Sequence, residues 1–238
     1  EQDLELYGQW PWPRHVMAML HAKIADAGAV LVNYNILFAE PDRMSGVEYL
    51  KSMPMTNELR EQLGQTLLDT DAVFSTVLRE SGRAVLMMSV KNEADQNLPS
   101  ATQIIKKGDV LPWLYEYAGI VPPHSRIMAG ATGVGVNVTS PEPDAVVRKM
   151  PMLINVGGKI YPSMIVENVR FVFGSKRIKV VANESGIKEI LVNKSNGVPV
   201  NQNGEMYINY ADPKKYVQMI VKELMSGDID VNKMQKRT

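Results

Sequence analysis

Apolar residues recur at helical spacing near the start of the chain, directly after a proline-rich stretch. Val16, Leu20 and Ile24 lie four residues apart, and neighbouring apolar residues widen this stripe to one helix face. Pro13 suits the first helical position, where its missing N–H costs nothing, and Gly28 suits the position that ends a helix. The pattern therefore predicts a helix between these two residues.

An almost continuous apolar run, Ala29 to Phe38, follows the predicted helix. It is rich in branched residues and fits a strand covered on both faces, as the parallel strands of α/β sheets are. Glu40, Pro41 and Asp42 end this strand, and residues 43–58 are interpreted as an irregular excursion. This run therefore predicts a buried first strand.

Helical spacing returns between Asn57 and Arg79 as two sets of apolar residues, which favours two helices in tandem with Gly82 as the stop. Residues 84–90 form a second apolar run and predict another buried strand. A polar loop without periodicity, residues 91–100, comes next. The alternation of helix and strand over this first part of the chain predicts a parallel α/β layer.

Shorter elements follow from residue 111 onward. We expect a short helix at 111–118, a glycine-bearing bend leading into a strand at 126–139, strands at 146–153 and 158–161 around a turn, a helix at 162–173 closed by Gly174, and strand-like pieces at 178–181, 187–192 and 206–210. Asparagine and glycine turns separate the last three pieces, which favours antiparallel pairing among them.

A last helix is marked at both ends, by Asp212 as N-cap, Pro213 at the first position and Gly227 after the end. Its apolar side must bury against the sheet. Together, the elements predict one α/β domain over residues 1–238, with a mostly parallel central sheet flanked by helices and a more antiparallel C-terminal half.

Composition narrows the classes of function. The chain has 238 residues and is 45% hydrophobic, enough for a sizeable core. Lysine plus arginine equal aspartate plus glutamate at 26 each, so no net field attracts nucleic acid, and we expect no nucleic-acid partner. There is no cysteine, which excludes disulfides, thiolate metal sites and a cysteine nucleophile.

The glycine and histidine patterns of the sequence do not match known phosphate-binding or metal-binding motifs. Gly130, Gly133 and Gly135 have the reverse of the dinucleotide-binding spacing with no helix after them, so we interpret them as a bend and strand passing close to a neighbouring backbone. His15 and His21 lie six residues apart, off the spacing that puts two imidazoles on one helix face. We expect no metal, no cofactor and no catalytic residue. The alternative function is an α/β hydrolase that uses paired loop carboxylates as acid and base, and the candidates are Glu40, Asp42, Glu142 and Asp144.

The strongest local signal is the pair of tryptophans before the first helix. Arg14 sits in the first helical turn, where a cation has the wrong sign for the helix dipole and something should compensate it. In the functional interpretation, Arg14 faces an anionic ligand or a partner carboxylate, and the indoles of Trp10 and Trp12 form a pocket wall. In the structural alternative, the indoles pin the loop onto the sheet edge and Arg14 pairs with an acidic residue among residues 1–5.

Four segments resemble a known family, the second type of CHASE domain, an extracellular sensor module associated with bacterial cyclases and histidine kinases. They read LYGQWPWPRHVMAMLHAKIADAGAVLVNYNILFAEPDR, TDAVFSTVLRESGRAVLMMSV, GVGVNVTSPEPDAVVRKMPMLINVGGKIYPSMIVENV and YINYADPKKYVQMIVKELMSGDID. The most specific parts are WPWPR and the segment from Asp144 to Pro151.

The resemblance implies a ligand-sensing domain outside the cytoplasmic membrane, without catalysis of its own. Its implied partners are an unidentified small-molecule ligand and the transmembrane helices and cytoplasmic cyclase or kinase domain of the same parent chain, and a homodimer is compatible with it. A dimerisation module without a small ligand is a further alternative. We also expect that terminal strands of the family are missing at both ends of this sequence.

The resemblance also marks positions. Recurring positions of the family fall on Trp10, Pro11, Trp12, Pro13, Arg14, Phe38, Asp144, Arg148 and Pro151. The sequence departs from the family at Asn35, where an acid is usual, and at Ala145, where glycine is usual. An α/β sheet places ligands at the carboxyl ends of its strands, here loops 35–42 and 91–100. The candidate ligand-binding residues are Trp10, Trp12, Arg14, Asn35, Glu40, Asp144 and Arg148, with the two arginines as anion partners.

Overall fold

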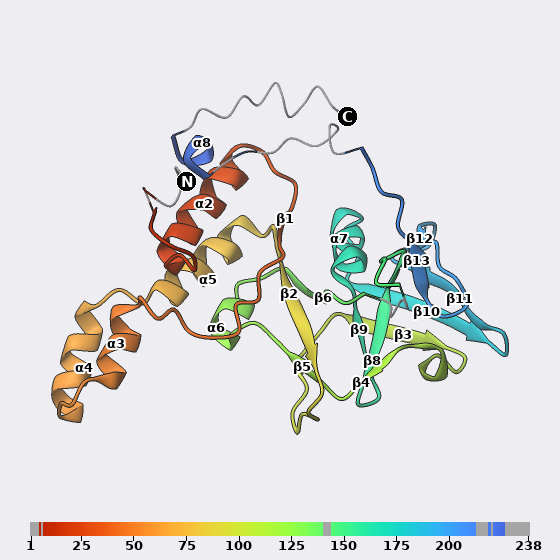
Figure 1. Cartoon of the computed structure of the whole chain (residues 1–238), viewed down its shortest axis with the longest axis horizontal. Helices are drawn as coiled ribbons and strands as arrows, with labels where there is room; N and C mark the ends of the chain where they lie inside the picture. The colour runs from red at the N-terminus through yellow and green to blue at the C-terminus, as the bar shows by residue number, and fades with distance from the viewer. Residues whose placement is uncertain (1–4, 6, 140–143, 213–218, 220, 227–238) are drawn as a thin grey trace.

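The centre of the fold is strand β2 (Ala84–Lys91), in a computed structural model that describes residues 5, 7–139, 144–212, 219 and 221–226 (Figure 1). β1 (Val32–Tyr34) and β6 (Gly133–Val136) pair with it in parallel, one on each side. β5 (Gly119–Val121) pairs antiparallel with its far end. The predicted parallel layer in the first part of the chain is confirmed.

Two helices cover this sheet and pack on each other, α2 (Arg14–Asp26) and α5 (Thr70–Ser81). Between them and the sheet, Tyr34, Phe38 and Phe74 meet edge to face with ring centroids 5.5–5.7 Å apart. All three side chains are almost fully buried. This aromatic cluster ties the segment after β1 to α5 and fixes where that segment leaves the sheet.

The first strand is much shorter than predicted, because only Val32–Tyr34 pairs with β2. β1 is an edge strand of the sheet. Val32 and Tyr34 are buried on one face and Asn33 is exposed on the other, so the strand is not covered on both faces. The apolar run continues to Phe38, which is 1% exposed, because residues 36–38 pack as a loop rather than as a strand. This loop borders the candidate site.

The expected irregular excursion is partly helical. It contains α3 (Gly46–Ser52), and α4 (Asn57–Thr66) follows, so the prediction for residues 43–58 is wrong at α3. The tandem helices α4 and α5 are confirmed. Arg60 donates to the carbonyls of Leu50 at 3.2 Å and Met53 at 3.0 Å, which holds α3 and α4 together. The pair projects away from the sheet as a hairpin (Figure 1).

Later strands form smaller sheets. β8 (Leu153–Val156) pairs antiparallel with β9 (Lys159–Pro162) and in parallel with β4 (Glu116–Tyr117). A single bridge between Val136 and Ser163 joins β9 to β6. The remaining strands are β3 (Gln103–Lys107), β10 (Arg177–Asn183), β11 (Gly186–Leu191) and β12 (Gly197–Val198) in one sheet, and β7 (Lys149–Pro151) with β13 (Glu205–Tyr207) in another. The more antiparallel second half is confirmed, although β3 pairs with β10 in parallel.

Two predicted elements in this half are wrong. The helix at 111–118 is only one turn of 3-10 helix, η1 (Leu111–Trp113), because the chain then enters β4 and pairs with β8. The strand at 146–153 is two short strands, β7 and β8, separated at Met152, whose N–H bonds to the carbonyl of Gly204 at 2.9 Å.

The helix at 162–173 is confirmed as α7 (Met164–Val172), and Ser163 caps its start. The glycines before it are confirmed as sites of close backbone approach. A Cβ on Gly135 would lie 2.6 Å from the backbone of Met164, and one on Gly130 would lie 2.2 Å from the carbonyl oxygen of Ser75. The last predicted helix is described only as α8 (Val221–Ser226), which packs on α2, and its other predicted residues from Pro213 to Gly227 lie mostly outside the described ones.

Candidate functional site

The proline-rich loop before α2 is held by its own aromatic side chains. Trp12 donates its indole N–H to the carbonyl of Gly8 at 2.9 Å, and the ring of Trp10 meets that of Trp12 edge to face with centroids 5.6 Å apart. Trp10 is 49% exposed. The loop therefore offers an indole to solvent at the beginning of α2.

A cleft of about 630 Å³ lies between this loop and the segment that follows β1. Its walls are residues 10–12 on one side and residues 36–44 on the other, and Arg14 lies between them. The structure thus brings together four predicted site residues, Trp10, Trp12, Arg14 and Glu40. The volume is within the range of small-molecule sites in proteins.

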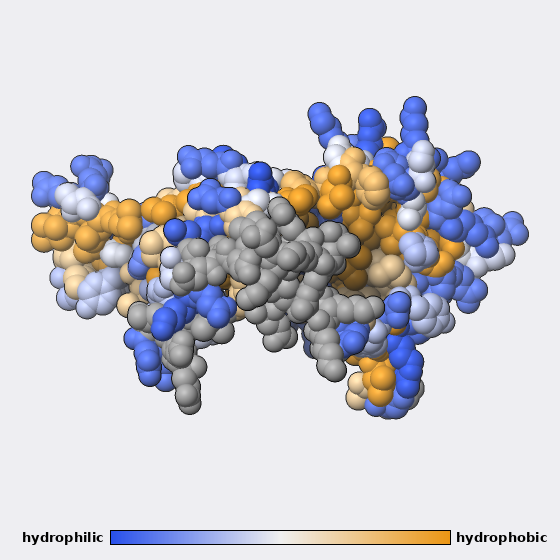
Figure 2. All heavy atoms as spheres, turned by 90° about the horizontal axis from the view of Figure 1, so that it is seen from above, coloured by the Kyte–Doolittle hydropathy of each residue, from blue (hydrophilic) through white to orange (hydrophobic). Residues whose placement is uncertain are grey.

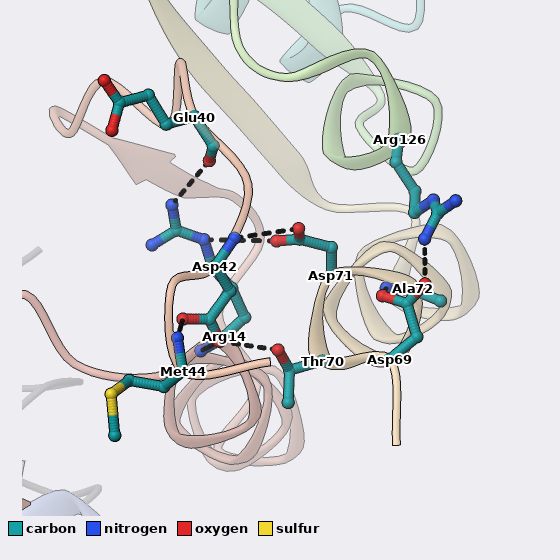
Figure 3. A network of polar contacts seen from close by, with 9 residues as sticks. All are labelled: Arg14, Glu40, Asp42, Met44, Asp69, Thr70, Asp71, Ala72 and Arg126. Atoms are coloured by element: carbon teal, nitrogen blue, oxygen red, sulfur yellow. Dashed lines mark hydrogen bonds and ion pairs between the residues drawn. The ribbon is translucent and has the colours of Figure 1, made fainter. Parts of the chain in front are cut away.

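Arg14, which lines the cleft, is the centre of a network of polar contacts (Figure 3). Its Nε lies 3.5 Å from Oδ1 of Asp71 in an ion pair, and its Nη2 donates to the carbonyl of Glu40 at 3.3 Å. The guanidinium carbon lies 4.5 Å from the centroid of the Phe38 ring. The compensation expected for a cation in the first helical turn therefore comes from a carboxylate at the start of α5. Of the acidic residues among residues 1–5, Glu1 and Asp3 lie outside the described part of the chain.

Asp42 connects the segment after β1 to both helices. Its Oδ2 accepts from the backbone N–H of Arg14 at 2.7 Å and from the hydroxyl of Thr70 at 2.6 Å, and its Oδ1 accepts from the N–H of Met44 at 3.0 Å. Its own N–H donates to Oδ2 of Asp71 at 3.0 Å. Both carboxylate oxygens are occupied, so Asp42 is not a free acid or base for hydrolysis.

Burial disfavours ionisation of Asp42, but the hydrogen bonds from Thr70, Arg14 and Met44 and the charge of Arg14 outweigh it, and its pKa is lowered. Burial lowers the pKa of Arg14 as well, while Asp71 and Asp42 oppose this. Arginine nevertheless keeps its proton at neutral pH. One positive charge thus faces two carboxylates, and Arg14 is no longer an uncompensated anion partner.

Two groups of the cleft still have capacity for a ligand. Nη1 of Arg14 makes no hydrogen bond within the described part of the chain and points away from Asp71 (Figure 3). The carboxylate of Glu40, an exposed residue, also points away from the network (Figure 3). A donor and an acceptor therefore accompany the indole of Trp10 around one cavity.

Three other predicted site residues do not line this cleft. Asn35 accepts a hydrogen bond from Asn137 at 2.6 Å, which joins the ends of β1 and β6. Asp144 and Arg148 form a bidentate ion pair at 2.9 and 2.7 Å before β7, in the other half of the molecule. The positions of these residues do not support a shared site, and Glu142 lies outside the described residues.

The second predicted ligand loop, residues 91–100, makes contacts of its own elsewhere. Asp95 accepts from the N–H of Ile120 at 2.8 Å and pairs with Lys91 at 2.5 Å. The carbonyl of Pro99 accepts from the hydroxyl of Tyr161 at 2.8 Å. None of residues 91–100 lines the cleft between residues 10–12 and 36–44.

Sequence reasoning missed Thr70 and Asp71, the partners of Asp42 and Arg14. Their only sequence signal is their place in the first turn of α5, just after the N-cap Asp69, where acidic and hydroxyl residues are common for local reasons. Nothing in that local pattern relates them to Arg14.

Two further features are absent from the described part of the chain. Among the described residues, no three or more His, Cys, Asp or Glu side chains come together in a way that could hold a metal ion. In the same part of the chain, no helix has the length and apolar character needed to cross a membrane.

An α/β domain with a tryptophan-walled cleft over a neutralising ion network has the features of a binding or sensory module. The chain belongs to the CHASE2 domain family, whose model matches residues 1–237. CHASE2 domains are extracytoplasmic, sensory rather than catalytic, and associated with cyclase and kinase receptors. The resemblance stated from the sequence is thereby confirmed. No curated protein and no solved structure matched the chain.

Proposed function

We propose that this chain is the signal-input domain of a transmembrane receptor, outside the cytoplasmic membrane, and that the tryptophan cleft is its ligand site. The observation that carries the proposal is the cavity between residues 10–12 and 36–44, with a half-exposed indole, Nη1 of Arg14 and the carboxylate of Glu40 around it. An apolar wall with a few convergent polar groups is the usual composition of a small-molecule site.

The charges around the cleft favour an uncharged or zwitterionic ligand over an anion. Asp42 and Asp71 together exceed the single charge of Arg14, and at the rim the exposed Glu40 and Arg43 carry opposite charges. An anion entering the cleft would gain little from an arginine that is already paired. A ligand with a flat apolar ring could stack on the indole of Trp10. Polar groups at the edge of that ring could bond to Nη1 of Arg14 and to the carboxylate of Glu40.

Helix α2 supplies a route from the cleft to the end of the chain. It begins at Arg14, runs 13 residues or about 20 Å, and packs against α8 (Figure 1). In a receptor of this kind, the output domain would follow the chain's C-terminal end through a membrane helix. A ligand that binds more tightly to one of two conformations of residues 36–44 raises the population of that conformation. The position of α2 relative to α8 changes with it.

Retention of small molecules by the purified chain tests the ligand site. Dialysis against a periplasmic extract, followed by mass spectrometry, should show compounds retained by the wild type and lost or about tenfold weakened by Trp10→Ala, because the exposed indole is a principal contact. Phe173→Ala is a matched control, since Phe173 lies at the end of α7, does not line the cleft and is 48% exposed, against 49% for Trp10. Equal retention by both variants, with equal thermal stability, would contradict the proposal.

A further inference from the structure

A second cleft, with a volume of about 440 Å³, lies where the two halves of the fold meet. This volume is within the range of small-molecule sites. Its walls are residues 100–102 before β3, residues 128 and 131–134 from the end of α6 (Ser125–Met128) into β6, and Arg170 and Lys176 at and just after the end of α7. None of these residues lines the tryptophan cleft, so the second cleft is a separate cavity.

The second cleft separates two apolar cores. On one side, Ala131 and Val134 pack in the core of the β2 sheet. On the other side, Arg170 extends from α7, whose Val166 and Val169 pack in the core around β10. A molecule bound in this cleft would therefore contact both halves of the domain at once.

Arg170 brings a fixed cation to the wall of this cleft, and it is only 9% exposed. Its Nε and Nη2 donate to Oε2 of Glu167 at 3.0 and 2.8 Å, and its Nη1 donates to the carbonyl of Ser175 at 2.6 Å. Nη1 and Nη2 each carry two hydrogens, so each keeps one N–H that no group in the described part of the chain accepts. A guanidinium that is held in place and has N–H groups to spare is a preorganised donor for an oxyanion.

Gly133 keeps space beside this guanidinium. A Cβ on residue 133 would lie 2.5 Å from Oε2 of Glu167 and 3.2 Å from Nη2 of Arg170. Any side chain at this position would therefore press on the carboxylate and lie against the guanidinium at the wall of the cleft. The glycine leaves Arg170 accessible from the cleft that both residues line.

The other polar side chains of the second cleft are also hydrogen-bond donors. Lys176 is exposed and forms no ion pair within the described part of the chain. In the same part of the chain, the hydroxyls of Ser100, Thr102 and Thr132 make no hydrogen bond. Among the described residues that line the cleft, none is an aspartate or a glutamate, and the buried Glu167 balances only one of the two cations. The cleft therefore has an excess positive charge, with donors on all three walls.

Exposed cations continue from the cleft along the neighbouring strands. Hydrophilic side chains project from the end of the molecule that β10 and β11 occupy (Figure 2). The exposed charged residues of β3, β10 and β11 are Lys106, Lys107, Arg177, Lys179, Lys188 and Glu189. Because all of these except Glu189 are cations, this side of a chain with zero net charge attracts anions.

We propose that the second cleft binds a small oxyanion, a carboxylate or a phosphate, and that the bound anion links the two halves of the domain. Arg170 and Lys176 bind the charged group, and the hydroxyls of the other two walls donate to its remaining oxygens. The apolar lining, which includes Met128 and Val134, accommodates an organic part of the ligand. The proposal does not depend on the tryptophan cleft, where carboxylates outnumber the charge of Arg14.

Calorimetric titration of the whole chain with inorganic phosphate and with succinate, at an ionic strength balanced by sodium chloride, tests the site. The wild type should bind at least one of these anions saturably. Lys176→Gln should weaken this binding about tenfold, because it removes a charge-assisted hydrogen bond. Lys188→Gln is the matched control, since it removes the same charge from an exposed lysine of β11 that does not line the cleft. Failure of both anions to bind, or equal binding by the two variants, overturns the proposal.

The same titration separates the two clefts and the two kinds of anion. Trp10→Ala should bind the anion as the wild type does, and a loss of binding in this variant would place the anion in the tryptophan cleft and contradict the proposal. Tighter binding of phosphate than of succinate assigns phosphorylated ligands to the second cleft, and the reverse order assigns carboxylates. Loss of small-molecule retention in Trp10→Ala with unchanged anion binding would support both sites independently.

Amide hydrogen exchange tests the link between the two halves. A saturating concentration of the anion that binds more tightly should slow exchange both in residues 128–134 and in residues 174–177, because the anion contacts both walls. At the same anion concentration, Lys176→Gln should lose most of this protection on both walls, whereas Lys188→Gln should keep it. Protection of only one wall in the wild type would contradict the link.

Discussion

The Arg14 network and the α3–α4 hairpin are neighbours in sequence, but they are opposite in how their side chains are partnered. In the network, Arg14, Asp42 and Asp71 are buried charges, and each contacts at least two other groups. In the hairpin, the leucines of α4 remain open to solvent. The charges of the network are thus held by partners within the chain, whereas the described part of the chain leaves the apolar side chains of the hairpin uncovered.

The largest expected effect comes from breaking the network. Asp71→Ala removes the ion pair with Arg14 and the acceptor for the N–H of Asp42, and should lower the free energy of unfolding by about 3 kcal/mol, because the buried Nε of Arg14 and the N–H of Asp42 both lose their partner. Asp71→Asn, which keeps an acceptor but not the charge, should lose less. Urea denaturation measures both.

The control for this prediction is Asp144→Ala. Asp144 also pairs with an arginine, but that pair is half exposed, and water compensates its loss. If Asp144→Ala destabilised the chain as much as Asp71→Ala, the distinction between a buried network and a surface ion pair would not hold.

A smaller effect is expected from acid, through His21. Its Nδ1 lies 2.9 Å from the hydroxyl of Tyr34 and its Nε2 lies 2.6 Å from the hydroxyl of Ser81. Burial lowers the pKa of His21, with a further contribution from the charge of Arg83. The folded chain therefore binds this proton less readily than the unfolded chain.

The stability that neutral His21 contributes is therefore complete above the ordinary histidine pKa of about 6.5 and is lost as the pH falls below it. Asp42 adds a second loss of stability below about pH 4. The pKa of its carboxyl is lowered in the folded chain, so on acidification the unfolded chain takes up this proton first. Denaturation curves between pH 7 and pH 5 should show a decline in the wild type that His21→Gln reduces. An unchanged decline would contradict the assignment to His21.

The smallest effect is expected in the hairpin. Leu63→Asp should change the free energy of unfolding of the monomer by less than about 0.5 kcal/mol, because this leucine contributes little to the core of its own chain. Urea denaturation measures this quantity. A loss comparable to that of Asp71→Ala would show that Leu63 contributes to folding as much as the buried network does.

The long periodic elements were predictable from the sequence because their patterns report local burial. Helices α2, α5 and α7 and strand β2 lie where the apolar spacing and the terminal glycines put them. β1 was predicted too long because an apolar run reports burial and not strand pairing, and Phe38 is buried from a loop. α3 was missed because it has seven residues and buries only Leu50.

Part of the candidate site could be predicted from the sequence. The proximity of Trp10, Trp12, Arg14 and Glu40 follows from a helix start and a strand end that lie close together in the chain's first α/β unit. The role of Asp71 did not, because it depends on how α5 packs against α2. Ala145, where the family usually has glycine, has φ 58°, a left-handed conformation that explains the usual glycine without any ligand.

Ligand recognition at the tryptophan cleft is tested most directly by the response of the parent receptor. Receptors that carry Trp10→Ala or Phe173→Ala would be exposed to the small-molecule fraction retained by the wild-type domain, and the activity of the cytoplasmic output domain would be measured. We expect Phe173→Ala to respond like the wild type and Trp10→Ala to lose most of the response at unchanged expression. Equal responses from both receptors would contradict the claim.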